Sequence, residues 1–220
     1  MPWKDGPVNG LRFPDRTVTE LMDRSAPNQT GKALDLGCAV GASSFVLANF
    51  FDRVTGLDFS ESFIEAANEI KRQGFLEYKY LEEGDTFGQG TVRCPEHSDK
   101  VSFVVGDACD LPNEWRGFDL VHAANLICRL PDPHVLFSRL PELVKVGGQL
   151  LLATPFTWLE EFTPKDKWVG NGNSAQALGE ALSPHFKLEK SVDLPFVIRE
   201  HRRKFQFSVS LGTRWRRVKE

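Results

Sequence analysis

Residues 33–44 constrain the fold more than any other part of this chain; they read Ala-Leu-Asp-Leu-Gly-Cys-Ala-Val-Gly-Ala-Ser-Ser. The apolar start predicts a short buried strand, Gly37 and Gly41 predict a tight turn, and the residues from Ser43 onwards predict a helix. In an open α/β sheet, ligands bind outside the carboxyl ends of the strands, above a turn of this kind. Glycine lets the backbone approach a ligand closely, and a helix N-terminus presents free N–H groups. The run therefore indicates an α/β fold with a ligand site at this turn.

Apolar strand patterns alternate with helical patterns over most of the chain, which predicts a parallel sheet. Two further strands, at 186–192 and 205–211, should pair antiparallel at the sheet edge. We expect one domain over residues 1–220, a doubly wound, Rossmann-like α/β fold with a mainly parallel seven-stranded sheet and an antiparallel edge strand. The other expected strands are 33–36, 53–57, 101–105, 118–124 and 149–153, and the expected helices include 43–51, 62–73 and 133–145.

Residues 75–100 interrupt this alternation. Two short apolar runs there are separated by Gly84, Gly88 and Gly90, a pattern that favours a hairpin over a helix. We expect this hairpin to be an insertion or an oligomer contact rather than a site of chemistry.

Charge and cysteine content exclude several classes of function. The net charge of −3 gives no general attraction to nucleic acid or anionic membranes, and the single basic run at 199–204 is too small to change this. The four cysteines have no metal-ligand spacing, so no metal site is predicted. No apolar run is long enough to span a bilayer and no signal peptide precedes the first strand, so we expect a cytoplasmic protein. The sequence leaves the oligomeric state open.

The spacing Asp35-x-Gly37-x-x-x-Gly41 differs from a dinucleotide fingerprint, because Ala39 replaces the middle glycine. This argues against a nicotinamide cofactor. The spacing resembles motif I of the class I S-adenosylmethionine-dependent methyltransferases. The resemblance implies that Asp35, Gly37, Cys38, Ala39 and Gly41 contact S-adenosylmethionine, with S-adenosylhomocysteine as the product. An ordinary strand–helix turn is the alternative.

Asp58 lies about 20 residues after the glycine turn and ends the next strand, where an acid can accept both ribose hydroxyls. We assign it, with the adjacent Phe59, to the cofactor site. The alternative is that Asp58 caps the helix that starts near Ser60. The pattern Ser62-x-x-Glu65 fits a capping box, so that task already has candidates.

Two more strand ends carry polar side chains. Asp107 can accept a hydrogen bond from the exocyclic amine of adenine, and Ala108 leaves room for a flat ring, although a plain turn aspartate is also common here. Asn125 follows the next strand, where cofactor and acceptor should meet, and we assign it a role in orientation. His122, inside that strand, is more easily read as a hydrogen-bonded core histidine than as a catalytic one.

Residues 154–170 form an aromatic and acidic run after the expected strand 149–153. Aromatic rings can sandwich a flat ring, and an acid can bind an ammonium group. An aromatic lid that only packs on the sheet is the alternative. The residues assigned to an acceptor pocket are Phe156, Trp158, Glu161, Lys165 and Trp168.

Several runs together resemble one family, the C-terminal methyltransferase domain of ovothiol synthase. They are Leu34–Gly41, Gly106–Cys109, Ala123–Ile127, Thr157–Lys165 and Pro195–Glu200. The resemblance implies transfer of a methyl group to an imidazole nitrogen of 5-mercaptohistidine, giving ovothiol A, and a sulfoxide synthase domain or enzyme as an upstream partner. An arginine would then bind the substrate carboxylate, Arg199 first and Arg203 second. The open alternatives are a methyltransferase for another small acid or amine, and a non-catalytic Rossmann-like binding domain.

Overall fold

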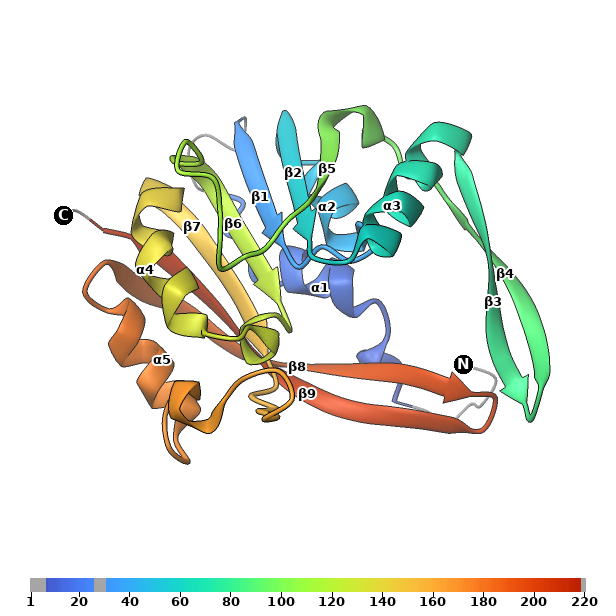
Figure 1. The fold of residues 1–220 in the computed structure, drawn as a ribbon. Coiled ribbons are helices and arrows are strands. Elements are labelled where there is room, and N and C mark those ends of the chain that lie inside the picture. The colour runs from blue at the N-terminus through green and yellow to red at the C-terminus, as the bar shows by residue number, and fades with distance from the viewer. Residues whose placement is uncertain (1–6, 26–30, 219–220) are drawn as a thin grey trace.

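The computed structural model describes residues 7–25 and 31–218, and its main feature is one seven-stranded sheet. The sheet comprises β1 (Lys32–Leu36), β2 (Arg53–Asp58), β5 (Val101–Val105), β6 (Phe118–Ala124), β7 (Val144–Thr154), β8 (Phe186–His201) and β9 (Lys204–Arg217). Their order is β5-β2-β1-β6-β7-β9-β8, and only β9 runs antiparallel to its neighbours. The predicted mainly parallel seven-stranded sheet is confirmed, and its edge strand β8 pairs antiparallel with β9 (Figure 1).

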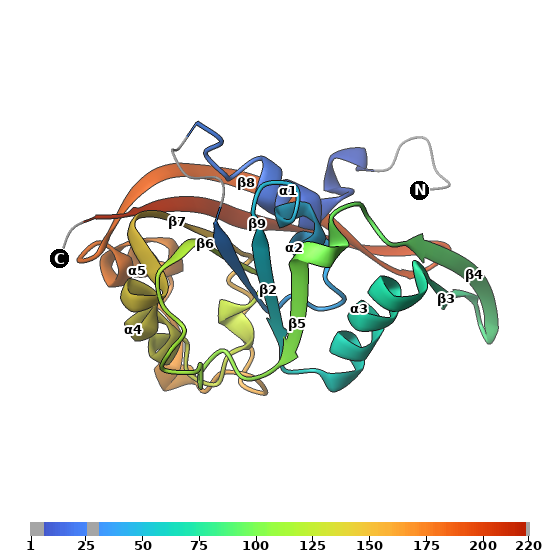
Figure 2. The same ribbon diagram turned by 90° about the horizontal axis from the view of Figure 1, so that it is seen from above.

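Helices cover both faces of this sheet (Figure 2). The α-helices are α1 (Phe13–Thr19), α2 (Ala42–Leu47), α3 (Glu61–Gln73), α4 (Pro133–Leu143) and α5 (Ser174–Leu182). Short 3-10 turns occur at η1 (Val8–Gly10), η2 (Ser98–Lys100), η3 (Ile127–Arg129) and η4 (Lys165–Lys167).

Alternate residues of the central strands enter two separate cores, because successive side chains of a strand point to opposite faces. In β1, Ala33 packs with α1 and α2 in one core, whereas Leu34 packs with α4 and α5 in the other. Leu151 and Leu152 of β7 divide in the same way. Both faces of the sheet are therefore buried, and its polar side chains concentrate at the strand ends.

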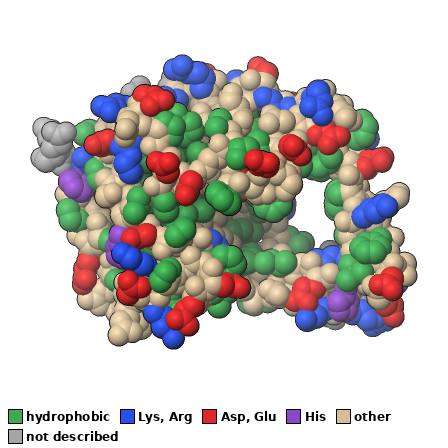
Figure 3. All heavy atoms as spheres, in the orientation of Figure 1, with side chains coloured by type: hydrophobic (Ala, Val, Ile, Leu, Met, Phe, Trp, Pro, Cys, Tyr) green, Lys and Arg blue, Asp and Glu red, His purple; other side chains and the backbone are tan. Residues whose placement is uncertain are grey.

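The segment 75–100 forms the predicted hairpin, with strands β3 (Phe75–Glu83) and β4 (Thr86–Arg93) in a separate two-stranded sheet. It projects from the end of α3, away from the main sheet (Figure 1). The β8–β9 pair also continues beyond its contact with β7 as a long hairpin over residues 194–210, which we call the arm. Arg202 of the arm donates its backbone N–H to the carbonyl of Glu82 at 3.0 Å. The two hairpins thus meet, and an opening separates them from the body of the molecule (Figure 3).

Several predicted boundaries were wrong. The strands expected at 186–192 and 205–211 extend to His201 and from Lys204 to Arg217, because the two strands pair with each other over these longer ranges. The helix expected at 43–51 ends at Leu47, where the Asn49 side chain donates to the carbonyls of Phe45 and Val46 and so competes with helical hydrogen bonds. The capping box at Ser62 is not used; the hydroxyl of Ser60 accepts the Phe63 N–H instead.

The helix expected at 133–145 ends at Leu143, and its last residues already follow Pro141, which has no N–H to donate. The strand expected at 149–153 begins earlier, at Val144, which pairs with Phe118 of β6.

Candidate functional site

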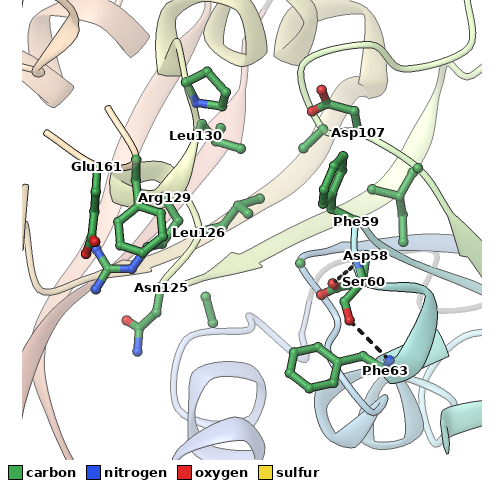
Figure 4. A pocket seen from close by; sticks show the side chains of 17 residues that line it. Asp58, Phe59, Ser60, Phe63, Asp107, Asn125, Leu126, Arg129, Leu130 and Glu161 are labelled. Carbon is green, nitrogen blue, oxygen red and sulfur yellow. Dashed lines mark hydrogen bonds between the residues drawn. The ribbon is translucent and has the colours of Figure 1, made fainter. Parts of the chain in front are cut away.

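A cavity of about 680 Å³ lies at the carboxyl ends of β1, β2, β5 and β6, where the sequence predicted a ligand site (Figure 4). Aliphatic and aromatic side chains supply much of its wall, and a few polar groups converge on it, as is typical of small-molecule sites. Seven of the residues assigned from sequence line it: Gly37, Asp58, Phe59, Asp107, Ala108, Asn125 and Glu161.

The glycine turn has the strained backbone that its sequence requires. Gly37 has φ of +69° and Gly41 has φ of +89°, in the left-handed region that glycine tolerates best. A Cβ at Gly37 would lie 3.0 Å from Leu126, another residue of the cavity wall. The N–H groups of Gly37 and Cys38 both donate to the carbonyl of Leu57, at 2.8 and 3.0 Å. These bonds fix the turn against the end of β2.

Asp58 joins this turn to the start of α3. Its Oδ2 accepts the N–H of Ala39 at 2.8 Å, and its Oδ1 accepts the N–H of Ser60 at 2.9 Å. The aspartate thus helps to order the helix start, as the alternative interpretation proposed, and it also lines the cavity. Each carboxylate oxygen has a second lone pair, so both can accept a further hydrogen bond from a ligand hydroxyl.

Asp35 does not line the cavity. Its side chain is 1% exposed, its Oδ2 accepts the hydroxyl of Ser44 at 2.6 Å, and its Oδ1 accepts Nδ1 of His122 at 2.7 Å. The other ring nitrogen of His122 lies 2.9 Å from Oγ1 of Thr17. His122 is therefore the hydrogen-bonded core histidine that the sequence indicated.

Cys38 and Ala39 form the inner part of the turn and do not line the cavity. The thiol of Cys38 is buried, and its Sγ lies 3.6 Å from the carbonyl of Ala39. Burial raises the pKa of this thiol, and the nearby carboxylates of Asp35 and Asp58 raise it further. Cys38 is thus held as a neutral thiol in the structure.

Two phenylalanines stand exposed at the cavity wall. Phe59 is 80% exposed and Phe63 is 47% exposed, which is unusual for aromatic side chains. On the same side of the cavity as Phe59, Oδ1 of Asp107 accepts the N–H of Cys109 at 2.8 Å, while Oδ2 makes no hydrogen bond with the described residues (Figure 4). This side of the cavity offers an open aromatic face and a carboxylate acceptor.

Asn125 is held rigidly at the end of β6. Its φ is +54°, its N–H donates to the carbonyl of Ala153 at 2.7 Å, and its Oδ1 accepts the hydroxyl of Ser210 in the arm at 2.7 Å. This last bond fixes the amide orientation, and the amide nitrogen makes no hydrogen bond with the described residues. Asn125 therefore presents an N–H donor at the cavity.

The aromatic run after β7 contributes less to the cavity than expected. Phe156 and Trp158 pack against the core beside α4 and α5, and Trp158 Nε1 donates to Ser174 at 3.0 Å. Trp168 Nε1 donates to the carbonyl of Thr163 at 2.8 Å, and Lys165 pairs with Glu160 at 3.3 Å. Of the predicted acceptor residues in this run, the structure places only Glu161 on the cavity wall.

Arg199 and Arg203 lie in the outer part of the arm and do not line the cavity. Arg199 Nη2 donates to Glu82 Oε1 at 2.9 Å, and its guanidinium lies 4.3 Å from the ring centroid of Tyr80. The backbone N–H of Arg203 donates to Nδ1 of His201 at 3.2 Å. Neither arginine is brought to Asn125 or Glu161.

Arg129 lines the cavity and was missed by the sequence argument. It ends η3, four residues after Asn125, and its guanidinium lies 4.7 Å from the ring centroid of Phe162. The only available signal was its place in the segment that follows the β6 strand end. Phe162, next to Glu161, also lines the cavity.

Among residues 7–25 and 31–218, no group of histidines, cysteines and acids is arranged to hold a metal ion. Within the same ranges, every helix is too short or too polar to cross a membrane.

Comparison with known proteins agrees with this geometry. The family profile described as "Methyltransferase domain" matches residues 34–152. The chain is 26% identical over 140 residues to O-methyltransferase cnsE of Penicillium expansum, which covers 63% of this chain and 43% of the relative. It is 26% identical over 172 residues to phosphoethanolamine N-methyltransferase 1 of Arabidopsis thaliana, covering 76% of this chain and 30% of the relative. The matches thus span less than half the length of these relatives.

Solved structures share the fold. The N-methyltransferase NodS from Bradyrhizobium japonicum WM9, in complex with S-adenosyl-L-homocysteine, has a TM-score of 0.55 at 14% identity, covering 86% of this chain and 79% of its own. The [4+2]-cyclase SpnF has a TM-score of 0.59 at 15% identity, covering 87% and 76%. The identities are low, so the structural likeness concerns the fold alone. The family profile covers more than half of the chain, and the chain therefore belongs to the methyltransferase domain family.

Proposed function

We propose that this cavity binds S-adenosylmethionine and that the chain transfers its methyl group to an imidazole nitrogen of 5-mercaptohistidine, forming ovothiol A. The observation that carries the cofactor assignment is the convergence of Gly37, Asp58, Asp107 and Asn125 on one cavity. The acceptor assignment rests on the resemblance of Thr157–Lys165 and Pro195–Glu200 to the ovothiol synthase methyltransferase domain.

The residues at the β2 and β5 ends fit a nucleoside. Asp58 has free lone pairs for ribose hydroxyls, and Asp107 Oδ2 can accept an exocyclic amine. The exposed ring of Phe59 offers a face on which a purine can stack. The absence of a side chain at Gly37 lets the turn lie directly against Leu126 in the cavity wall, because a Cβ there would come within 3.0 Å of Leu126. The residues present thus match the chemistry of the cofactor.

When bound, S-adenosylmethionine supplies a methyl group that is already activated on a sulfonium sulfur. The protein's task is then mainly to position the acceptor, which can account for a large part of a rate enhancement. The fixed amide of Asn125 can orient a polar group of the acceptor through its free N–H. The acceptor contains two nucleophiles, a thiolate and a ring nitrogen, so the orientation must select nitrogen.

A mass-spectrometric assay tests this proposal, with S-adenosylmethionine and 5-mercaptohistidine as substrates and histidine as the control acceptor. We expect one methyl group to be added to 5-mercaptohistidine alone, and fragmentation should place it on a ring nitrogen. Asp58→Ala should abolish turnover at limiting cofactor. Asp85→Ala, in the exposed turn of the β3–β4 hairpin, is the matched control and should retain it.

Three results would contradict parts of the proposal. Methylation on sulfur would remove the positioning argument. Tight binding of S-adenosylhomocysteine without turnover of 5-mercaptohistidine would keep a methyltransferase and discard this acceptor. Calorimetry that shows no binding of S-adenosylhomocysteine would favour a non-catalytic Rossmann-like domain.

A further inference from the structure

We infer that Arg129 and Glu161 form the acceptor subsite, in which Arg129 binds the α-carboxylate and Glu161 the α-ammonium group of an amino acid. This inference rests on the proposed function, because it assigns the acceptor end of the same cavity. It names a residue, Arg129, that was not predicted from sequence, and it places the carboxylate contact in η3 rather than in the arm.

The guanidinium of Arg129 is held in place by one of its nitrogens. Nη1 donates to the carbonyl of Thr157 at 2.8 Å and to the carbonyl of Cys128 at 3.0 Å. The planar group also lies over the ring of Phe162, at 4.7 Å from its centroid. Nε and Nη2 make no hydrogen bond with any described residue. These two nitrogens form one edge of the guanidinium, which is the geometry that binds a carboxylate through two parallel hydrogen bonds.

Glu161 is held nearby by the backbone of its own loop. The N–H groups of Phe162 and Thr163 both donate to the carbonyl of Leu159, at 3.0 and 2.9 Å. The buried hydroxyl of Thr163 donates to the carbonyl of Leu130 at 2.7 Å. The loop that carries Glu161 is therefore tied to Leu130, the residue that follows Arg129, and this holds the backbone of Glu161 close to η3.

Arg129 and Glu161 do not form an ion pair with each other. The described residues contain no ion pair between Arg129 and Glu161, although both line the same cavity and lie on the same side of it (Figure 4). A zwitterion satisfies both charges at once. An amine without a carboxylate, or an acid without an ammonium group, leaves one of the two charges unpaired, so such analogues should bind less well.

S-adenosylmethionine also carries an α-carboxylate and an α-ammonium group, so either the cofactor or an amino-acid acceptor can supply the groups that Arg129 and Glu161 bind. In Figure 4, Arg129 and Glu161 lie across the cavity from Asp58, Phe59 and Asp107, the residues that fit the nucleoside. The turn at Gly37, which motif I assigns to the cofactor, is fixed to Leu57 of β2 rather than to η3. We therefore assign the two charges to the acceptor.

The test compares 5-mercaptohistidine with its decarboxylated and its deaminated analogue, at saturating S-adenosylmethionine. Arg129→Ala should raise KM for 5-mercaptohistidine by about 10- to 100-fold, the loss expected for charge-assisted hydrogen bonds, and leave KM for the decarboxylated analogue unchanged. Glu161→Gln should act in the same way on KM for 5-mercaptohistidine and spare the deaminated analogue. Because each comparison is made within one variant, a general loosening of the loop would affect both acceptors equally.

Two neighbouring changes serve as matched controls. Glu160→Gln removes an acid that pairs with Lys165 outside the cavity, and Arg116→Ala removes an exposed arginine that bonds the carbonyl of Asn113. Neither should change the preference for the amino acid. Calorimetry with S-adenosylhomocysteine should give equal affinities for the wild type, Arg129→Ala and Glu161→Gln. Weaker binding in both variants would assign the charges to the cofactor and overturn the inference.

Separate results test the acceptor 5-mercaptohistidine and the subsite formed by Arg129 and Glu161. If the wild type does not methylate 5-mercaptohistidine, that acceptor is wrong. The protein loaded with S-adenosylhomocysteine is then titrated with the common amino acids and their decarboxylated amines. Binding of an amino acid that is lost in Arg129→Ala supports the subsite, whereas binding of amines alone, or of none of these compounds, overturns it.

Discussion

His122 donates a hydrogen bond of 2.7 Å to Asp35 across the centre of the sheet, and each side chain is only 1% exposed. The bond joins β6 to β1, and Ser44 and Thr17 extend it to α2 and α1. Asp35 belongs to the motif that marks the cofactor turn, yet its carboxylate is fully engaged inside the protein. Its effect on the site is therefore indirect, through the position of the turn that follows it.

His122→Phe should lower the free energy of unfolding by about 2 kcal/mol, because it leaves Oδ1 of buried Asp35 without a partner. Urea unfolding followed by fluorescence measures this change. His134→Ala, an exposed histidine in α4, should change stability by less than about 0.5 kcal/mol. If His122→Phe is as stable as the wild type, the network contributes nothing and the turn is fixed by its backbone bonds alone.

Phe59→Ala should weaken binding of S-adenosylhomocysteine by about threefold to tenfold, the value of an aromatic stacking contact. The reason is that the ring stands 80% exposed at the cavity and gains a partner only in the complex. Phe87→Ala is the control: it removes another exposed ring, 58% exposed, from the β3–β4 hairpin and should not affect binding. Isothermal calorimetry measures the affinity of each variant for S-adenosylhomocysteine. If Phe59→Ala binds as tightly as Phe87→Ala, Phe59 does not contact the cofactor.

The sequence predicted the part of the site that depends on the sheet. Parallel strands bring their carboxyl ends to one edge, so Asp58, Asp107 and Asn125 could be placed together from strand order alone. Placing them required no knowledge of side-chain packing, since each lies at the end of its strand or within two residues of it. The hairpin at 75–100 was also predictable, from its glycines and the end of α3.

The acceptor side of the cavity was harder to predict from the sequence, because loops rather than strand ends form it. Residues 154–170 contain many candidate side chains, and which of them faces the cavity is decided by contacts such as that of Trp158 with Ser174 and that of Thr163 with Leu130. Arg129 could not be recognised because its role depends on Thr157 and Phe162, which lie about 30 residues further along the chain. Arg199 was assigned from a resemblance in β8, whose outer part the structure places beside Glu82.

Glu189→Gln should destabilise the protein in a pH-dependent way. The Arg216 guanidinium lowers the pKa of Glu189 below its ordinary value of 4.5, because it donates to both carboxylate oxygens. A lowered carboxylate pKa adds stability above the pKa of the unfolded chain, and this stability is lost as the pH falls through the folded pKa. We expect a loss of about 1 kcal/mol at pH 7 that shrinks below about pH 4.5.

Urea unfolding of the wild type and Glu189→Gln at several pH values between 7 and 3 measures this dependence. Glu69→Gln, on the surface of α3, is the control and should show no comparable difference at either end of the range. A difference between wild type and Glu189→Gln that stays constant down to pH 3 would mean that the carboxylate charge is not its source.

Arg199→Ala and Glu82→Gln should have similar effects, because they remove the two halves of one contact between the arm and the β3–β4 hairpin. The pair is partly exposed, so a double-mutant cycle should give a coupling of about 0.5 to 1 kcal/mol. Both variants should also speed exchange of the Arg202 amide, which donates to the carbonyl of Glu82. Hydrogen exchange followed by NMR measures this local opening.

The same two variants decide whether Arg199 contacts substrate. If its role is to hold the arm, Arg199→Ala and Glu82→Gln shift KM for 5-mercaptohistidine by the same factor, through Ser210 and the orientation of Asn125. If Arg199 binds the acceptor carboxylate directly, only Arg199→Ala raises KM, and the decarboxylated analogue is unaffected by it. The structure supports the first outcome, since the guanidinium of Arg199 already pairs with Glu82 and stacks on Tyr80, away from the cavity that Asn125 and Arg129 line.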